Sequence, residues 1–229
     1  MKLKRHRVIR GIIRCETGLR IGGTKDAIEI GGMDNPIIRH PITGLPYVPG
    51  SSIKGRMRSL IELKNNKFNH HSGEPCNCAQ GNCPVCRIFG PHKAPNHSLG
   101  PTRLIVRDAM LTEEWEAKLK EAQEEKGIYF AEIKTENWID RRTGRAADKG
   151  LRTQERVPAG TEFKMELVIR EFEGDGDRHT VDTVLDGLRL IEKEYIGGSG
   201  SRGYGKVTFQ QLMLDGASIS LHEEAVKVQ

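Results

Sequence analysis

The chain is organised around one run of residues, Gly197-Gly198-Ser199-Gly200-Ser201-Arg202-Gly203-Tyr204-Gly205-Lys206. Five of these ten residues are glycines, which adopt positive φ readily and let the backbone approach a ligand closely. Arg202 and Lys206 add positive charge at the same place. The run predicts a loop that holds phosphate.

Two known phosphate motifs nearly match this loop. Gly198-x-Gly200-x-x-Gly203 has the spacing of the dinucleotide fingerprint, but that motif follows a strand and opens a helix, and here the order is reversed. Gly200-x-x-x-x-Gly205-Lys206 has the spacing of a P-loop, but Val207 replaces the Ser or Thr that would hold Mg²⁺. An extended polyanion such as RNA remains, and a plain glycine turn between a helix and a strand stays open as the alternative.

Hydrophobic periodicity outlines the rest of the fold. We expect strands over 8–17, 103–111, 163–169 and 207–214, and helices from Pro49–Ser52 to about Lys64, from Thr112 to Gly127 and over 181–191. The core order β-α-β-β-α-β predicts an α+β fold of the ferredoxin-like or RRM-like type, in which the first and last strands pair antiparallel. That pairing would bring the glycine-rich loop, residues 197–206, close to the turn Gly18–Gly23 and to the helix start at Ser51–Lys54.

Composition restricts the class of protein. The 229 residues suffice for a single domain over 1–229 with its own core, and 36 Lys and Arg against 31 Asp and Glu give a net charge of +5. The basic residues cluster, notably at 141–156 and 202–206, as a nucleic-acid partner requires. The basic N-terminus lacks the apolar core of a signal peptide, and no apolar run approaches membrane-spanning length. We therefore expect a cytoplasmic protein with no membrane partner.

Four cysteines lie in a polar insertion over residues 65–102, namely Cys76, Cys78, Cys83 and Cys86. Four thiolates within eleven residues predict a closed, structural Zn²⁺ site that replaces the apolar core such an insertion lacks. The short Cys76-x-Cys78 spacing leaves open that His70, His71 or His92 replaces one thiolate. A chance grouping of free thiols is the other alternative.

The first helix begins with Pro49-Gly50-Ser51-Ser52 and carries Lys54 and Arg56 in its first turns. Cations oppose the helix dipole there, so their presence favours contact with an anion such as phosphate. A solvated helix face is the alternative. The chain lacks the aromatic run on which an ordinary RNA-recognition domain stacks bases, which favours capture of the RNA backbone.

Several segments together resemble one family. They are Thr17–Gly23, Asp34 after Gly31-Gly32, Pro46–Gly55, Cys86–Gly90, Ile139–Gly144 and the glycine-rich loop. Together they are similar to the repeated RNA-cleaving backbone subunit of type III-A CRISPR effector complexes, in the Csm group of RAMP proteins. The similarity spans nearly the whole chain.

The resemblance implies a subunit that polymerises along a CRISPR RNA with other copies of itself and other Csm subunits, and that cuts complementary target RNA at regular intervals in antiviral defence. It implies a metal-dependent endoribonuclease, with Asp34 catalytic and Mg²⁺ or another divalent cation required. Residues 133–155 would form a thumb that enters the guide–target duplex. The implied RNA-binding residues are Arg20, Ser51, Ser52, Lys54, Arg56, Ile139, Arg141, Arg152, Gly198, Ser199, Gly200, Ser201 and Arg202.

One departure concerns the mechanism. Many relatives carry histidine where this chain has Arg20, which excludes a histidine base at that position and leaves charge stabilisation by the guanidinium. Asp34 could bind metal or accept the 2′-hydroxyl proton, and without the resemblance it reads as a turn residue before Pro36. A purely architectural CRISPR-RNA-binding subunit and a RAMP-type CRISPR RNA-processing endonuclease remain the alternative functions.

Overall fold

The computed structural model describes residues 1–23, 35–127, 130–175 and 177–222. Its strands are β1 (Leu3–Cys15), β2 (Leu104–Val106), β3 (Met110–Leu111), β4 (Glu132–Glu136), β5 (Arg152–Arg156), β6 (Glu162–Phe172), β7 (Val207–Leu214) and β8 (Ala217–Ser218). Its helices are α1 (Gly50–Asn65), α2 (Pro84–Phe89), α3 (Glu113–Lys126), α4 (Asp177–Lys193) and a 3₁₀ turn, η2 (Gly200–Arg202).

The main sheet has the strand order β2-β6-β1-β7-β8, with β3 also pairing with β6. Every pairing is antiparallel. The expected pairing of the first and last strands is present, with Cys15 at the end of β1 opposite Val207 at the start of β7. Because the two strands run in opposite directions, the loop before β7 lies beside the turn after β1.

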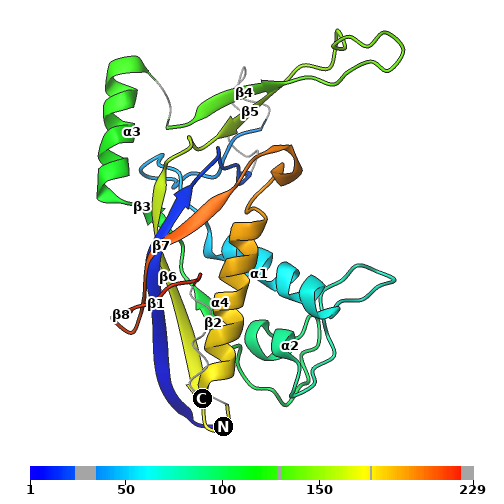
Figure 1. Ribbon diagram of the computed structural model, residues 1–229, viewed down its shortest axis with the longest axis vertical. Coiled ribbons are helices and arrows are strands. Elements are labelled where there is room, and N and C mark those ends of the chain that lie inside the picture. The colour runs from blue at the N-terminus through cyan, green and yellow to red at the C-terminus, as the bar shows by residue number, and fades with distance from the viewer. Residues whose placement is uncertain (24–34, 128–129, 176, 223–229) are drawn as a thin grey trace.

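Helices α1 and α4 cover one face of the sheet (Figure 1). Ile9 and Ile13 of β1 are buried in one hydrophobic core with Met57 of α1 and Leu188 of α4. The two helices approach closely at Gly187, where a Cβ atom would lie 2.3 Å from Cγ of Met57. A glycine is therefore required in α4 although it weakens the helix.

The segment 103–111 was expected to be one strand, and the structure divides it into β2 and β3. Between them Asp108 turns away from the sheet, and its carboxylate accepts a hydrogen bond of 2.7 Å from the amide of Gly50 at the start of α1. A carboxylate at a helix N-terminus satisfies an amide that has no partner within the helix. Asp108, which separates β2 from β3, thus caps the N-terminus of α1.

The insertion between α1 and β2 is less polar than its composition suggests. The short helix α2 contributes Val85, Ile88 and Phe89, together with Cys86, to the main hydrophobic core. The expectation that this insertion lacks apolar packing is therefore wrong. A helix of six residues is too short to show a periodic pattern in the sequence.

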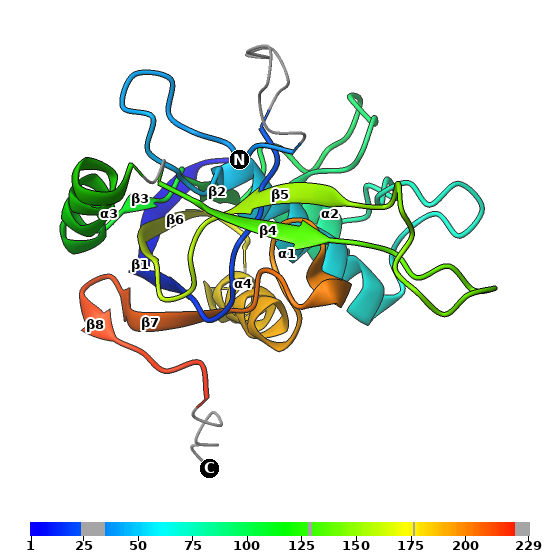
Figure 2. The same ribbon diagram turned by 90° about the horizontal axis from the view of Figure 1, so that it is seen from above.

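Strands β4 and β5 form a separate two-stranded hairpin that rises from one end of the molecule (Figure 1). Seen from above, it lies across the top of the core and its tip extends beyond it (Figure 2). The tip closes where the amide of Gly144 donates to the carbonyl of Asp140, at 2.8 Å. Three large apolar side chains near this tip, Trp138, Ile139 and Leu151, are exposed.

Within the described ranges, none of the helices combines the length and the apolar character needed to traverse a lipid bilayer.

Candidate nucleic-acid interface

The glycine-rich loop packs backbone to backbone against the turn that follows β1. The amide of Gly205 donates to the carbonyl of Gly18 at 3.0 Å, and that of Gly198 donates to the carbonyl of Arg20 at 2.8 Å. A Cβ atom on Gly197 would lie 2.3 Å from the same carbonyl oxygen of Arg20. These glycines therefore serve the contact between two segments, and the exposed part of the loop begins at Ser201.

Gly205 is a position in this contact that has no room for a side chain. Its φ is +70°, and a Cβ atom there would lie 2.0 Å from the carbonyl oxygen of Ile196. We expect Gly205→Ala to lower the free energy of unfolding by about 2–5 kcal/mol, from left-handed strain plus overpacking. Gly203→Ala is the matched control, because Gly203 has a φ of +84° but no atom near its Cβ position. Urea unfolding should give about 1–2 kcal/mol for the control, and equal losses would contradict the close contact.

The catalytic candidate Asp34 lies outside the described residues, but the structure describes both ends of its loop. The amide of Ile38 donates to the carbonyl of Ile21 at 2.8 Å, and the amide of Gly23 donates to that of Pro36 at 3.2 Å. These bonds join the residues that flank the segment 24–34.

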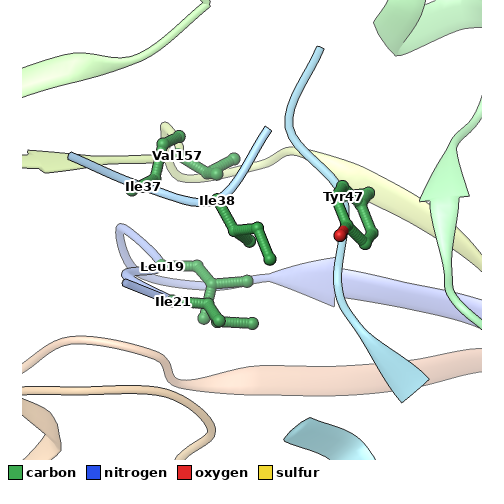
Figure 3. Close-up of a pocket in the computed structure, with 6 residues that line it drawn as sticks. All are labelled: Leu19, Ile21, Ile37, Ile38, Tyr47 and Val157. Atoms are coloured by element: carbon green, nitrogen blue, oxygen red, sulfur yellow. The ribbon is translucent and has the colours of Figure 1, made fainter. Parts of the chain in front are cut away.

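An apolar cluster reinforces this closure (Figure 3). Its side chains come from the turn after β1, from the returning chain and from the end of β5, namely Leu19, Ile21, Ile37, Ile38, Tyr47 and Val157. They leave no room for a water-sized molecule between them. The cluster is a packing contact and not a ligand pocket.

Asn35, covalently bonded to Asp34, is anchored on two sides. Its side-chain oxygen accepts a hydrogen bond from Nη2 of Arg20 at 3.2 Å, and its amide nitrogen donates to the carbonyl of Thr153 in β5 at 3.4 Å. Arg20 also lies beside the glycine-rich loop, because a Cβ atom on Gly198 would be 3.5 Å from Nη1. Arg20 therefore joins the chain next to Asp34 with the loop predicted to bind phosphate.

The start of α1 differs from the sequence-based expectation. The side chain of Asp108 occupies the Gly50 amide, and the ammonium group of Lys54 donates to the carbonyl of Leu104 at 2.8 Å. Burial, together with the nearby Arg170 and Arg58, lowers the pKa of Lys54. Within the described chain, the carboxylate of Asp108 thus already acts as the anion at this helix start. Ser51 is exposed there and Ser52 is half-buried.

Arg56 connects α1 to the glycine-rich loop. Its Nε donates to the carbonyl of Tyr195 at 2.9 Å, and its guanidinium lies 4.1 Å from the centroid of the Tyr195 ring. That ring fills the space above Gly200, where a Cβ atom would be 2.1 Å from the ring carbons. Arg56 therefore supports the glycine-rich loop through its contacts with Tyr195.

The face of the sheet opposite the helices carries charge pairs. Arg10 of β1 pairs with Glu166 of β6 at 2.9 Å, and Arg14 pairs with Glu162 at 3.2 Å. Such a face offers no stacking platform at these positions, in agreement with the absence of an aromatic run from the sequence. Arg141, Arg152 and Arg202, which we predicted to contact RNA, lie instead on the hairpin and the glycine-rich loop.

The hairpin contributes the remaining candidates. Ile139 and Arg141 are exposed near its tip, and Arg152 begins β5 opposite Glu136, where the tip loop, residues 137–151, joins the ladder. At this end of the ladder, Arg152 and Arg202 of the glycine-rich loop both reach the carboxylate of Glu136, at 3.2 and 3.6 Å. Glu136 was not among the predicted site residues, although the alternation Glu132, Lys134, Glu136 places these three charged side chains on one face of a strand.

The four cysteines of the insertion meet as predicted. Their sulfur atoms all lie within 4.8 Å of one another, and the Cys76–Cys78 and Cys76–Cys83 distances are 3.6 and 3.8 Å. Four sulfurs about 2.3 Å from a tetrahedral ion would be separated by about 3.8 Å, so this donor set fits a metal ion. No histidine is needed to complete it.

The cysteine cluster is docked on α1 through Cys76. The carboxylate of Glu62 accepts from the amide of Cys76 at 2.9 Å, and Arg58 donates to its carbonyl at 2.9 Å. Arg58 and Glu62 also pair with each other at 2.8 Å. This pair fixes the insertion to the helix that supports the glycine-rich loop.

Comparison with known proteins agrees with this geometry. A model of the RAMP superfamily matches residues 12–208. The "CRISPR system Cms endoribonuclease Csm3" of Methanothermobacter thermautotrophicus is 47% identical over 225 residues, covering 93% of this chain and 87% of that protein. The protein of the same name from Methanocaldococcus jannaschii is 42% identical over 217 residues, covering 93% and 82%.

A solved structure is also similar. The crystal structure of the Csm3–Csm4 subcomplex in the type III-A CRISPR-Cas interference complex contains a chain with 32% identity and a TM-score of 0.59. The match covers 93% of this chain and 80% of that one. The protein described here therefore belongs to the Csm3 family of the RAMP superfamily.

Proposed function

We propose that this protein is a CRISPR-RNA-binding backbone subunit of a type III-A interference complex and cleaves complementary target RNA at regular intervals. Its relatives are named Csm3 endoribonucleases, and the similar solved structure pairs Csm3 with Csm4. Its partners would be CRISPR RNA, target RNA, further copies of itself and other Csm subunits. The core would be the ferredoxin-like fold, a reading that the strand order β2-β6-β1-β7 supports.

One observation carries the proposal. The residues that flank the segment containing Asp34 are joined beside Arg20, between the glycine-rich loop and β5. A nucleic-acid strand bound by the loop and the hairpin would pass this point. The hairpin, with its exposed Ile139 and Arg141, would be the thumb of the proposed subunit.

The proposed RNA contacts divide into three groups. Ser51, Ser201, Arg202, Ile139, Arg141 and Arg152 have exposed side chains that can reach a ligand directly. Arg20, Arg56, Gly198 and Gly200 would shape the backbone around it, through the contacts described above. Ser52, Lys54 and Ser199 would contribute through the same surface, Lys54 only after its bond to Leu104 is released.

Cleavage of RNA needs little protein chemistry, because the 2′-hydroxyl is the nucleophile. The site would splay one nucleotide into in-line geometry, and Arg20 would stabilise negative charge on the scissile phosphate. Asp34 would hold a divalent cation, since a carboxylate with an ordinary pKa of about 3.9 is a weak base at neutral pH. The bound cation would supply charge stabilisation at the phosphate. Zn²⁺ in the cysteine cluster would be structural.

The test is cleavage of complementary RNA by the protein assembled on a guide. We expect products at regular spacing in the presence of Mg²⁺ and none after treatment with EDTA. Intact RNA under both conditions would indicate an architectural subunit. A single cut in the guide precursor, with no cutting of target, would indicate a processing endonuclease.

A further inference from the structure

The carboxylate of Glu136 is the centre of a polar cluster at the base of the tip loop, residues 137–151, where this loop joins the ladder of β4 and β5. Five side chains from β4, β5 and the glycine-rich loop surround it. Measured to its nearest oxygen, they are Tyr204 Oη at 2.8 Å, Gln154 Nε2 at 3.2 Å, Arg152 Nη2 at 3.2 Å, Arg202 Nε at 3.6 Å and Lys134 Nζ at 3.6 Å.

Burial in this cluster is layered. The Glu136 side chain is 11% exposed, whereas Lys134 is 36% exposed and Arg152 and Arg202 are each 47% exposed. The anion thus lies beneath three cations that face solvent. Three positive charges against one negative charge leave an excess of two on this small surface, which we call the basal cluster.

The hairpin register explains how the cluster forms. Glu136 lies opposite Arg152, and Lys134 lies opposite Gln154, so all four share one face of the hairpin. Tyr204, 1% exposed, reaches this face from the glycine-rich loop, and the Lys134 ammonium lies 4.4 Å from the centroid of its ring. The cluster therefore joins the loop to the hairpin.

Glu136 is ionised at neutral pH. Burial alone would raise its pKa, but the Tyr204 hydroxyl and the cations Arg202, Lys134 and Arg152 outweigh burial and hold the pKa below its usual value. An ionised carboxylate can fix the directions of the surrounding cations. Long basic side chains held in place lose less conformational entropy on binding a ligand.

We propose that Lys134, Arg152 and Arg202 form a phosphate-binding site for the RNA backbone, and that Glu136 is the positioning residue that holds the three cations in place. This inference rests on the proposed binding of CRISPR RNA. It assigns a role to Lys134, and it predicts that the buried carboxylate of Glu136 strengthens binding of a polyanion. Net charge alone would predict that this carboxylate weakens the binding.

The two predictions differ in whether RNA affinity falls or rises when Glu136 loses its charge, and this can be measured. We expect Glu136→Gln to weaken binding of CRISPR RNA about 5-fold or more at 0.1 M salt and to make the plot of log affinity against log salt shallower. The control Glu114→Gln removes the same charge from α3, away from the basal cluster and from the proposed RNA contacts, and should leave affinity unchanged or slightly higher. Tighter binding by Glu136→Gln, as by the control, would overturn the proposal.

A second pair of variants covers the case in which Glu136→Gln does not fold, as judged by its circular dichroism. Lys134→Met should reduce the slope of log affinity against log salt by about 0.7, the value for one contact to single-stranded RNA. Lys120→Met, which removes a lysine paired with Glu116 on α3, should not change it. Equal slopes for both variants would reject the site. Failure of the unmodified protein to bind CRISPR RNA would instead reject the proposed function.

Discussion

Replacing Asp34 by alanine should abolish cleavage of target RNA and leave binding of CRISPR RNA intact. Removing the carboxylate removes the proposed metal ligand, and a cation at the scissile phosphate stabilises the transition state by several kcal/mol. We therefore expect the cleavage rate to fall at least about 100-fold. The measurement is single-turnover cleavage of labelled complementary RNA, with affinity for the guide determined on the same preparation.

Two further carboxylates on the same loop provide the control. Asp26 and Glu29 also lie outside the described residues, and we expect both to be solvated. Asp26→Ala and Glu29→Ala should each cleave within about 3-fold of the unmodified protein, because solvated charges contribute little. Unchanged cleavage by Asp34→Ala, with Mg²⁺ present, would remove Asp34 from the site. Loss of guide binding would show that its role is structural.

The sequence predicts the order of the elements well where a hydrophobic pattern extends over many residues. The alternation in β1 and the 3.6-residue spacing in α1 and α4 correspond to the observed elements, and the order of these elements predicts that β1 and β7 pair. The contact between the glycine-rich loop and the turn Gly18–Gly23 follows from this pairing alone. Strand direction, and not local propensity, brings these distant segments together.

The sequence predicts less where a side chain bonds across the fold. Lys54 and Arg56 look alike in the sequence, but one donates to β2 and the other to the segment before the glycine-rich loop. Asp108 ends a strand by capping α1. In the sequence, Glu136 cannot be told from an ordinary exposed charge on a strand. Its role depends on contacts with Tyr204 and Arg202, which lie far from it in the chain. Such roles depend on tertiary contacts that local patterns do not encode.

The cysteine cluster should govern the stability of more than the insertion. Cys83 is 2% exposed, and its sulfur accepts a hydrogen bond from the amide of Cys86 at the start of α2. Helix α2 in turn contributes Val85, Ile88 and Phe89 to the core. Losing the thiolate would therefore release apolar side chains that pack against the rest of the domain.

We expect Cys83→Ser to lose bound Zn²⁺ and to lower the free energy of unfolding by more than about 3 kcal/mol, since structural zinc contributes on the order of 10 kcal/mol in small domains that depend on it. Cys15→Ser is the control, because Cys15 is equally buried in β1 but lies outside the sulfur group, so it should unfold earlier while retaining the metal. Metal content and thermal unfolding, measured before and after treatment with a chelator, separate the two effects. The chelated protein should match Cys83→Ser in stability, because both lack the same four-sulfur link between α2 and α1. A chelated protein as stable as the untreated one would show that buried side chains alone hold the insertion in place.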